Sequence, residues 1–291
     1  MDCPATVGKL TEVLLRGGYI ADRGLATALF VSLTLERPLL LEGEVGVGKT
    51  ELAKVLAQIF GRKLIRLQCY EGIDTNQALY EWDYARQMLQ IRALSESQVV
   101  REDAVEKLFG PKFLVERPLL EAVRAGDQAV LLIDEVDRAD DEFEAFLLEV
   151  LSDFQVSIPE IGTIKAETAP IVILTSNRTR ELHDALKRRC LYHWIGFPTP
   201  EREVEIVMVK EPGVSASLTR KVVAAVNRLR EMDLNKPPGV AETIDWVRTL
   251  DVLGEDDLDA DIAEDTLGAI IKEHDDLEMV RENLDEITSG A

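Results

Sequence analysis

One run of the chain has the residue types and the spacing of a phosphate-binding loop. Residues 43–50 read GEVGVGKT and match the pattern GxxxxGK[ST] at every fixed position. Glycines let the backbone turn its N–H groups toward an anion, and a helix that starts at the loop directs its positive end to the same point. A glycine-rich turn with a chance Lys-Thr pair is the alternative. Because an apolar strand pattern precedes the loop and a helical pattern follows it, we expect the loop to bind the phosphates of ATP.

Each residue of this loop has an expected role toward ATP and Mg²⁺. Lys49 is expected to reach the β- and γ-phosphates, and the hydroxyl of Thr50 is expected to bind Mg²⁺. The other residues predicted to bind the nucleotide here are Gly43, Glu44, Val45, Gly46, Val47, Gly48 and Glu51.

Two carboxylates end a second apolar run, LLIDE at residues 131–135. Asp134 is expected to hold the Mg²⁺ shell, and Glu135 to orient and polarise the attacking water. A strand that merely ends in acidic turn residues is the alternative, and the phosphate loop argues against it. A small-molecule kinase would also carry such a loop, but it does not usually need a second carboxylate placed for water. The pair therefore predicts hydrolysis of ATP.

Two further groups follow a third apolar run. Asn177 ends the run IVILTSN and is expected to hydrogen-bond the γ-phosphate or the same water, unless it only starts a turn. Arg188 and Arg189 lie in the basic cluster DALKRRC of a very acidic chain. An arginine presented to a neighbouring subunit stabilises charge in the transition state. Cations that favour a helix C-terminus are the alternative. We expect a catalytic arginine here, with Arg189 ahead of Arg188.

The elements that must position these groups alternate between strands and helices along residues 38–200. We expect strands at 38–42, 63–69, 129–133, 171–175 and 191–195, and helices at 49–60, 81–94, 141–151 and 181–189. This alternation predicts an α/β fold with a parallel sheet and helices on its faces. The runs LLLEG and VLLIDE are apolar throughout, which is typical of strands buried on both faces.

The pattern becomes entirely helical beyond Pro198 and Pro200. Helices are expected at 201–210, 215–231 and 241–252, with a final pair within 259–287. The sequence therefore predicts an α/β ATPase core over residues 1–199 and an all-helical lid domain over residues 200–291.

Composition narrows the classes of function. The chain carries 54 acidic and 33 basic residues, a formal net charge of −21, which disfavours binding to nucleic acid through a basic surface. The three cysteines are far apart and indicate reduced thiols rather than disulfides. Neither a signal peptide nor a membrane span is recognisable. We therefore expect a cytoplasmic protein.

The order of these motifs resembles that of the AAA+ superfamily, and the longer runs look like its MoxR branch, in particular CoxD-type members. The runs are RLQCYEG (66–72), IDEVDRADDEFEAFLLEVLSDFQV (133–156), LTSNRTRELHDALKRRCLYHWI (174–195) and PPGVAETIDW (237–246). The likeness covers nearly the whole chain. It implies a parallel-sheet P-loop core with a helical lid, and a homo-oligomeric, hexameric ring with ATP lying between subunits.

The same resemblance implies further partners and sites. The adenine would pack near Tyr19 and Ile20, before the first strand of the sheet. A protein with a von Willebrand factor A domain would act with the ring, as a chaperone that matures or activates a metalloenzyme client. CoxD-like proteins serve the copper–molybdenum centre of carbon monoxide dehydrogenase. Inserts at 154–169 and 70–82 would project toward the ring's pore, unless they are an ordinary hairpin and loop.

One stretch departs from the family pattern. MoxR-type lids offer an arginine, termed sensor 2, at the start of a lid helix, but residues 239–243 read GVAET, and Arg248 lies too far along the helix to be assigned that role.

Two other functions compete with the chaperone. A nucleic-acid motor or loader is disfavoured by the acidity, and intact Lys49, Asp134 and Glu135 argue against a weakly hydrolysing, ATP-gated scaffold.

Overall fold

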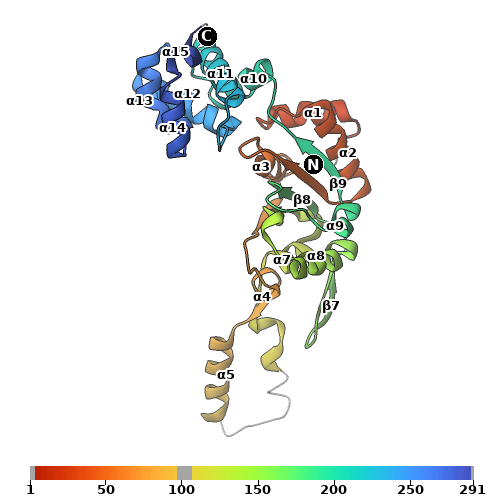
Figure 1. Ribbon diagram of the computed structural model, residues 1–291. Helices are drawn as coiled ribbons and strands as arrows, with labels where there is room; N and C mark the ends of the chain where they lie inside the picture. Colours follow the sequence, from red (N-terminus) through yellow and green to blue (C-terminus); the bar gives the residue numbers. More distant parts are fainter. Residues whose placement is uncertain (1–3, 97–106, 290–291) are drawn as a thin grey trace. The chain divides into compact units, whose positions relative to one another are not determined.

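A parallel sheet with strand order β2-β5-β8-β1-β9 positions the candidate site in the computed structural model, which describes residues 4–96 and 107–289 (Figure 1). β5 and β8 lie in the middle of the sheet and are buried along their whole length. All five strands predicted from apolar runs are confirmed, with ends that move by at most one residue. Their bounds are β1 (Leu39–Gly43), β2 (Lys63–Gln68), β5 (Ala129–Asp134), β8 (Ile171–Ser176) and β9 (Leu191–Ile195).

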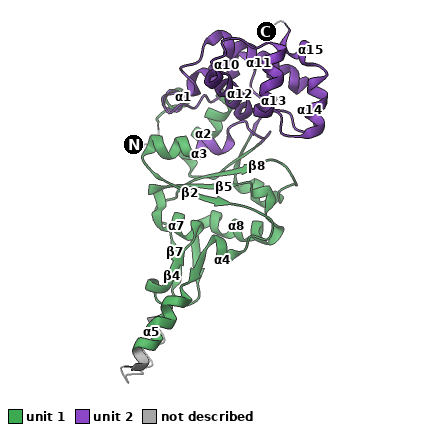
Figure 2. Ribbon diagram, turned by 90° about the vertical axis from the view of Figure 1, so that its left-hand side faces the viewer, with its two compact units in different colours: residues 1–10, 23–42, 53–193 green, residues 11–22, 43–52, 194–291 purple. Residues whose placement is uncertain are grey.

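Helices cover both faces of this sheet (Figures 1 and 2). α2 (Arg23–Leu35) lies over one face, and α7 (Pro118–Ala125) and α8 (Asp141–Asp153) lie over the other. The helices predicted at 49–60 and 141–151 are confirmed as α3 (Lys49–Phe60) and α8. The helix predicted at 181–189 starts later, as α9 (Asp184–Arg189), because the His183 side chain accepts a hydrogen bond from the Ala185 N–H and caps the helix there.

Two inserts leave this layered core. The hairpin predicted at 154–169 is confirmed as antiparallel β6 (Gln155–Ile158) and β7 (Gly162–Lys165). The segment 70–82 forms α4 (Thr75–Ala78) and β3 (Tyr80–Trp82), and β3 pairs with β4 (Leu114–Glu116).

The first residues of the helix predicted at 81–94 are not helical. Glu81 and Trp82 pair with β4, so α5 (Tyr84–Glu96) begins only after the Asp83 side chain caps it by accepting a hydrogen bond from the Arg86 N–H. Sheet pairing with a distant segment therefore overrides the local helical pattern. The short helices of this part of the chain are η1 (Lys107–Phe109), η2 (Pro111–Phe113), η3 (Gly126–Gln128) and η4 (Val136–Arg138).

The chain divides into two compact units, which Figure 2 colours separately. Unit 1 comprises residues 1–10, 23–42 and 53–193, and unit 2 comprises residues 11–22, 43–52 and 194–291. The phosphate loop thus groups with the C-terminal helices, while the carboxylates after β5 belong to unit 1. The boundary predicted between residues 199 and 200 stays a prediction.

Helices make up the C-terminal part of unit 2, packed around the fully buried Trp246. Its indole N–H donates to the Thr266 hydroxyl at 2.8 Å, which satisfies the buried polar atom. Three predicted helices are confirmed, but the pair expected within 259–287 is three helices. The chain breaks twice there, at Ile271, which takes an extended conformation and ends α13, and at Asn283, which is not helical and precedes α15. The helices are α10 (Pro200–Lys210), α11 (Ala216–Glu231), α12 (Val240–Leu253), α13 (Ala260–Ile270), α14 (His274–Arg281) and α15 (Leu284–Thr288); α1 (Val7–Arg16) lies near the N-terminus.

Among residues 4–96 and 107–289, no helix combines the length and the apolar character that crossing a membrane requires.

Candidate functional site

The phosphate loop closes around the side chain of Lys49. Its ammonium group donates to the carbonyls of Gly43 at 2.8 Å and Glu44 at 2.6 Å, and the residue is only 6% exposed. α3 begins at Lys49, so the positive end of the helix dipole points into the same loop. A buried cation and a helix N-terminus therefore meet where an anion would bind.

Two glycines of the loop are required by its surroundings within unit 2. A Cβ atom at Gly43 would lie 1.9 Å from the carbonyl oxygen of Ile195, which accepts a hydrogen bond from the Glu44 N–H. Gly46 has a φ of +76°, a conformation that L side chains rarely adopt, and a Cβ there would lie 3.1 Å from Cα of Gly239. Of these two, Gly43 is a fixed glycine of the sequence pattern, whereas Gly46 stands at a variable position; the other fixed glycine, Gly48, has a φ of +92°.

Tyr19 contacts the loop from the N-terminal segment. Its hydroxyl donates to the Gly48 carbonyl at 3.4 Å, and the residue is 8% exposed. Burial raises the pKa of this hydroxyl above its ordinary value, so it stays protonated and remains a donor. At the start of α3, Glu51 forms an ion pair with Lys210 at 2.7 Å. The segment that contains Tyr19 and Ile20 thus lies against the loop.

The Asp134 carboxylate is held from both neighbouring strands. β5 lies between β2 and β8, and Asp134 is 3% exposed. The Thr175 hydroxyl donates to Oδ1 at 2.5 Å, and the Arg66 guanidinium donates to Oδ2 at 2.5 and 3.1 Å. These bonds hold the carboxylate in one orientation, as a ligand for a cation requires.

The next residue, Glu135, has a left-handed backbone conformation with φ 54° and ψ 49°. Its N–H donates to the Thr175 hydroxyl at 3.0 Å. The carboxylate accepts a hydrogen bond from Gln68 Nε2 at 3.1 Å and lies 3.4 Å from the Arg138 guanidinium. Non-glycine residues rarely adopt this conformation, and where they do it often marks a functional position.

Sequence reasoning missed the residues that hold these two carboxylates. Arg66, Gln68 and Thr175 come from the strands on either side of β5, and Gln68 is in register with Asp134. One signal was available, since polar residues alternate with buried leucine and isoleucine at the end of β2. That alternation indicates that one side of β2 faces something other than the apolar core.

The backbone around Asn177 is fixed by the buried carboxylate of Asp137. Asp137 accepts hydrogen bonds from the Asn177 N–H at 3.2 Å, the Thr179 N–H at 2.8 Å and the Thr179 hydroxyl at 2.7 Å. It is 2% exposed. Asn177 therefore lies on a turn after β8, and hydrogen bonds to Asp137 hold this turn against η4. Glu135 directly precedes η4 in the sequence. Asp137 is a fourth residue, after Arg66, Gln68 and Thr175, that the sequence did not single out.

Arg188 and Arg189 end α9, which is held at both of its ends. Before the helix, Glu144 accepts a hydrogen bond from the His183 N–H at 2.8 Å and forms an ion pair with Arg180. At its end, Arg37 donates to the main-chain carbonyls of Arg188 and Arg189. The candidate catalytic arginines thus lie on a short, fixed helix.

The start of α12 contacts the phosphate loop without an arginine. The Ala241 N–H donates to the Gly46 carbonyl at 3.1 Å. The Glu242 carboxylate accepts a hydrogen bond from the Gly239 N–H at 3.0 Å and lies beside Gly46. Arg248 forms ion pairs with Glu211 and Asp245 instead. The stretch in which the resemblance implies a sensor 2 arginine therefore presents a carboxylate.

The sequence predicts no catalytic or metal-binding role for the cysteines and histidines. Cys69 and Cys190 are free and buried. Within residues 4–96 and 107–289, no group of three or more His, Cys, Asp or Glu side chains is arranged to hold a metal ion.

Comparison with known proteins places this arrangement in a family. The AAA_5 family, described as AAA domain (dynein-related subfamily), matches residues 38–190, which include the phosphate loop, both carboxylates, Asn177 and the two arginines. Protein NorQ of Paracoccus denitrificans is 26% identical over 200 residues, which cover 66% of this chain and 64% of NorQ. Gas vesicle ATPase GvpN2 of Halobacterium salinarum is 25% identical over 265 residues, 87% of this chain and 74% of GvpN2.

Other matches are to longer or more distant proteins. Chaperone protein ClpB of Bacillus cereus is 31% identical over 140 residues, 46% of this chain, and the match spans only 13% of ClpB. A RuvB structure from Thermotoga maritima shares the fold with a TM-score of 0.51 at 17% identity, covering 98% of this chain and 79% of RuvB. The likeness to RuvB shows the P-loop AAA+ fold alone. Since the family match extends over more than half of the sequence, the chain belongs to the AAA domain family of the dynein-related subfamily.

Proposed function

We propose that the protein binds ATP with Mg²⁺ and hydrolyses it to ADP and phosphate. The observation that carries the proposal is the buried Lys49 ammonium inside a loop of the phosphate-binding pattern, at the start of α3. β1, β5 and β8 are parallel strands of one sheet, so their carboxyl ends share one edge. Ligands of open α/β sheets bind outside that edge.

The roles proposed for the side chains follow from their chemistry. Lys49 binds the β- and γ-phosphates, and Tyr19 and Ile20 border the adenine. Glu135 takes the proton of the attacking water, while Asn177 orients that water or the γ-phosphate. The Thr50 hydroxyl and the Asp134 carboxylate fit Mg²⁺, which prefers oxygen ligands and takes the rest from phosphates and water. Bound Mg²⁺ neutralises charge on the phosphates.

We further propose that Arg189, or Arg188 in its place, completes the site of a neighbouring subunit. The main chain of these arginines is tied to the amino end of β1, where the Leu191 N–H donates to the Pro38 carbonyl at 2.8 Å. At roughly 3.3 Å per residue, Pro38 lies about 13 Å along the strand from Glu42, which precedes the phosphate loop. This separation supports action on a neighbour over action on the subunit's own phosphates.

Mixing two inactive variants tests both proposals. Lys49→Ala removes nucleotide binding but keeps the arginine, and Arg189→Ala keeps binding but lacks the arginine. Each should be inactive alone, yet a mixed ring contains some complete sites, so ATPase activity should return. Fluorescence transfer between labelled subunits checks that they exchange. Exchange without restored activity would remove Arg189 from the shared site, and the same experiment with Arg188→Ala then decides between Arg188 and a purely structural helix end.

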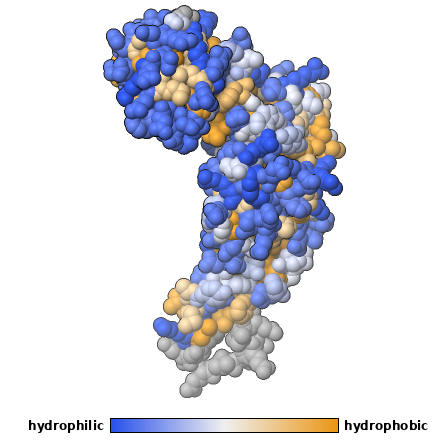
Figure 3. Space-filling view, viewed as in Figure 1, coloured by the Kyte–Doolittle hydropathy of each residue, from blue (hydrophilic) through white to orange (hydrophobic). Residues whose placement is uncertain are grey.

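As a MoxR-type ATPase, the protein is proposed to work in the cytoplasm as a hexameric ring with a von Willebrand factor A domain partner, remodelling a metalloenzyme client. We propose that the client contacts α5, the helix that follows the 70–82 insert: Tyr84, Met88 and Leu89 of α5 are 64%, 55% and 67% exposed, while Gln87 on the same helix is buried. Figure 3 shows apolar side chains gathered on this part of the chain. Exposed apolar stripes of this kind mark interaction surfaces.

A trap variant tests the partner and the client. Glu135→Gln should hold ATP, so a pull-down with it should retain partner and client together. Adding Met88→Asp and Leu89→Asp should release the client while ATP binding persists, and Val252→Asp, at an exposed position of α12, is the matched control. The client proposed from the CoxD-type resemblance is a molybdenum/copper carbon monoxide dehydrogenase. Its absence from the captured proteins would contradict that client but not the ATPase.

A further inference from the structure

Arg37 makes a contact that the proposed ATPase chemistry does not account for. Its guanidinium donates through Nη2 to the carbonyls of Arg188 at 2.9 Å and Arg189 at 3.0 Å, and through Nε to Arg189 again at 3.3 Å. One planar fork therefore bonds two successive peptide groups. These bonds set the orientation of the main chain from which both candidate arginines project.

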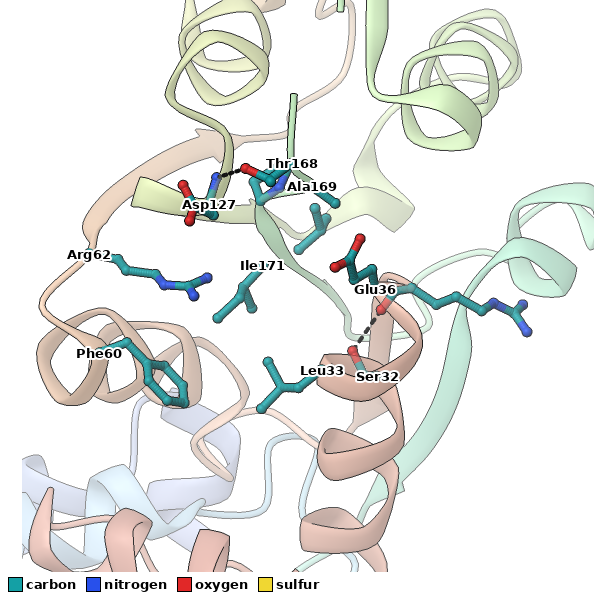
Figure 4. Close-up of a pocket in the computed structure, with 12 residues that line it drawn as sticks. Ser32, Leu33, Glu36, Phe60, Arg62, Asp127, Thr168, Ala169 and Ile171 are labelled. Carbon is teal, nitrogen blue, oxygen red and sulfur yellow. Dashed lines mark hydrogen bonds between the residues drawn. The ribbon is translucent and has the colours of Figure 1, made fainter. Parts of the chain in front are cut away.

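The backbone of Arg37 is itself fixed. The Ser32 hydroxyl, on a residue only 3% exposed, donates to the Arg37 carbonyl at 2.7 Å, and the Arg37 N–H donates back to the Ser32 carbonyl at 3.1 Å. Figure 4 draws the first of these bonds. The next residue, Pro38, bonds Leu191 at the start of β9. Arg37 is thus a rigid anchor between the end of α2 and the end of α9.

A general preference of helix C-termini for cations explains this contact poorly. α9 spans only residues Asp184–Arg189, and its last turn already carries Lys187, Arg188 and Arg189. A fourth positive charge beside these three is repelled by them, which offsets the favourable interaction with the helix end. What the guanidinium adds is geometry. It fixes two peptide planes at the C-terminal end of α9, whereas Glu144 bonds the residue before the start of that helix.

We propose that Arg37 is a positioning residue that aims Arg189, or Arg188, at the nucleotide of the neighbouring subunit. This inference rests on the proposed function of these arginines in trans. Arg37 precedes β1, at the end of the strand opposite the phosphate loop, so it touches no residue assigned to its own subunit's ATP site. Its loss should leave nucleotide binding intact and slow hydrolysis in the neighbour.

The test compares Arg37→Ala with Arg62→Ala. Arg37 and Arg62 both line a pocket of about 240 Å³, and Arg62 lies over the ring of Phe60 (Figure 4). Misplacing a reacting group by about 1 Å costs up to about a hundredfold in rate. Arg37→Ala should therefore lower kcat by about ten- to a hundredfold with the Kd for ATP, ring assembly and Tm unchanged. Arg37→Lys should retain intermediate activity, since one ammonium cannot bridge two peptides as the fork does. Arg62→Ala should match the wild type.

Mixing separates positioning from general damage. Arg37→Ala subunits mixed with Lys49→Ala subunits should regain activity, because the latter supply a well-placed arginine. Arg37→Ala subunits mixed with Arg189→Ala subunits should stay inactive, because neither variant supplies a well-placed arginine. Wild-type kcat in Arg37→Ala, loss of assembly or of ATP binding, or equal restoration in both mixtures would overturn the role of Arg37. If Arg188→Ala and Arg189→Ala both keep full kcat, the trans arginine itself fails, and the inference fails with it.

Discussion

Lys49 carries a charge in a buried position, and the phosphate loop around it stabilises the buried ammonium group. An ammonium group that is 6% exposed loses most of its hydration, which is costly unless hydrogen bonds replace the water. The carbonyls of Gly43 and Glu44 supply such bonds. Phosphate oxygens carry more negative charge than these carbonyls, so we expect the same ammonium to bind them more strongly.

Lys49→Ala should therefore abolish tight ATP binding. The loop would keep its N–H groups but lose the cation that faces the β- and γ-phosphates. Titration with a fluorescent ATP analogue measures the effect. Lys63→Ala, at a lysine whose side chain is 67% exposed and paired with Glu121, is the control and should bind normally. Equal affinity in both variants would exclude Lys49 from the phosphate site.

Glu135→Gln should separate binding from hydrolysis. The amide keeps the size and the hydrogen-bonding reach of the side chain but cannot accept a proton from water, and losing a general base costs about 10²–10⁴-fold. Turnover should fall at least about a hundredfold, while ATP stays bound. Phosphate release and nucleotide retention measure the two effects. Glu149→Gln, an exposed change on α8, is the control. Undiminished turnover in Glu135→Gln would remove this carboxylate from the mechanism.

The buried thiols allow a prediction about pH. Burial raises the pKa of Cys69 and of Cys190 to about 12 from the ordinary 9.0, with the Asp134 carboxylate adding to the effect at Cys69 and Arg37 opposing it at Cys190. Both thiols should stay protonated, and slow to alkylate, at pH 8–9, where an exposed cysteine reacts. Iodoacetamide labelling followed by mass spectrometry, in a Cys3→Ser background, tests this. Rapid labelling of the folded protein would contradict it, and unfolded protein serves as the control.

At the scale of elements, an ion pair joins three of the C-terminal helices. Arg230 of α11 bonds both oxygens of Glu203 of α10 at 2.6 and 2.8 Å, and the Thr243 hydroxyl of α12 donates to the same carboxylate at 2.6 Å. The Arg230 and Glu203 side chains are 7% and 0% exposed. The guanidinium also lies over the ring of Phe197, 4.4 Å from its centre. Removing one charge would leave the other buried without its partner.

Arg230→Met should lower the free energy of unfolding by about 3–5 kcal/mol, the usual cost of breaking a buried pair from one side. Denaturation in guanidinium chloride, followed by circular dichroism, measures it. The control is Arg248→Met, which removes a surface arginine paired with Glu211 and should leave the free energy of unfolding nearly unchanged, because water screens an exposed ion pair. Similar losses in the two variants would show that burial does not strengthen the Arg230 pair. Adding Glu203→Leu to Arg230→Met should recover part of the loss.

At the scale of the whole molecule, the proposed active site shared between subunits predicts that activity depends on assembly. Specific ATPase activity should rise with protein concentration, because a free subunit lacks the neighbour's arginine. The net charge of −21 makes subunits repel one another, so moderate salt should shift assembly to lower concentration by screening that repulsion. A dilution series read by phosphate release and light scattering tests both points. Constant specific activity without assembly would contradict the shared site.

The sequence by itself determined the features that depend on neighbouring residues. The phosphate loop could be recognised because its fixed glycines, lysine and threonine lie within eight residues. The contacts that exclude a side chain at Gly43 and Gly46 come from Ile195 and Gly239 and were not visible in that pattern. The five parallel strands could be located because burial on both faces demands unbroken apolar runs. The order of the motifs carried the family resemblance. Helix caps and the pairing of β3 with β4 shifted only the ends of several helices from their predicted positions.

The tertiary structure decided which distant residues meet. The side chains that hold Asp134 and Glu135 are Arg66, Gln68 and Thr175, and they reach these carboxylates only because β5 lies between β2 and β8. The order of the strands in the sheet cannot be read from the spacing of residues along the chain. Arg37 meets the end of α9 across 151 and 152 positions of sequence. The start of α5 likewise depended on the pairing of β3 with β4, more than 30 residues away. Local patterns specify elements, whereas the partners of a polar side chain depend on how the sheet brings those elements together.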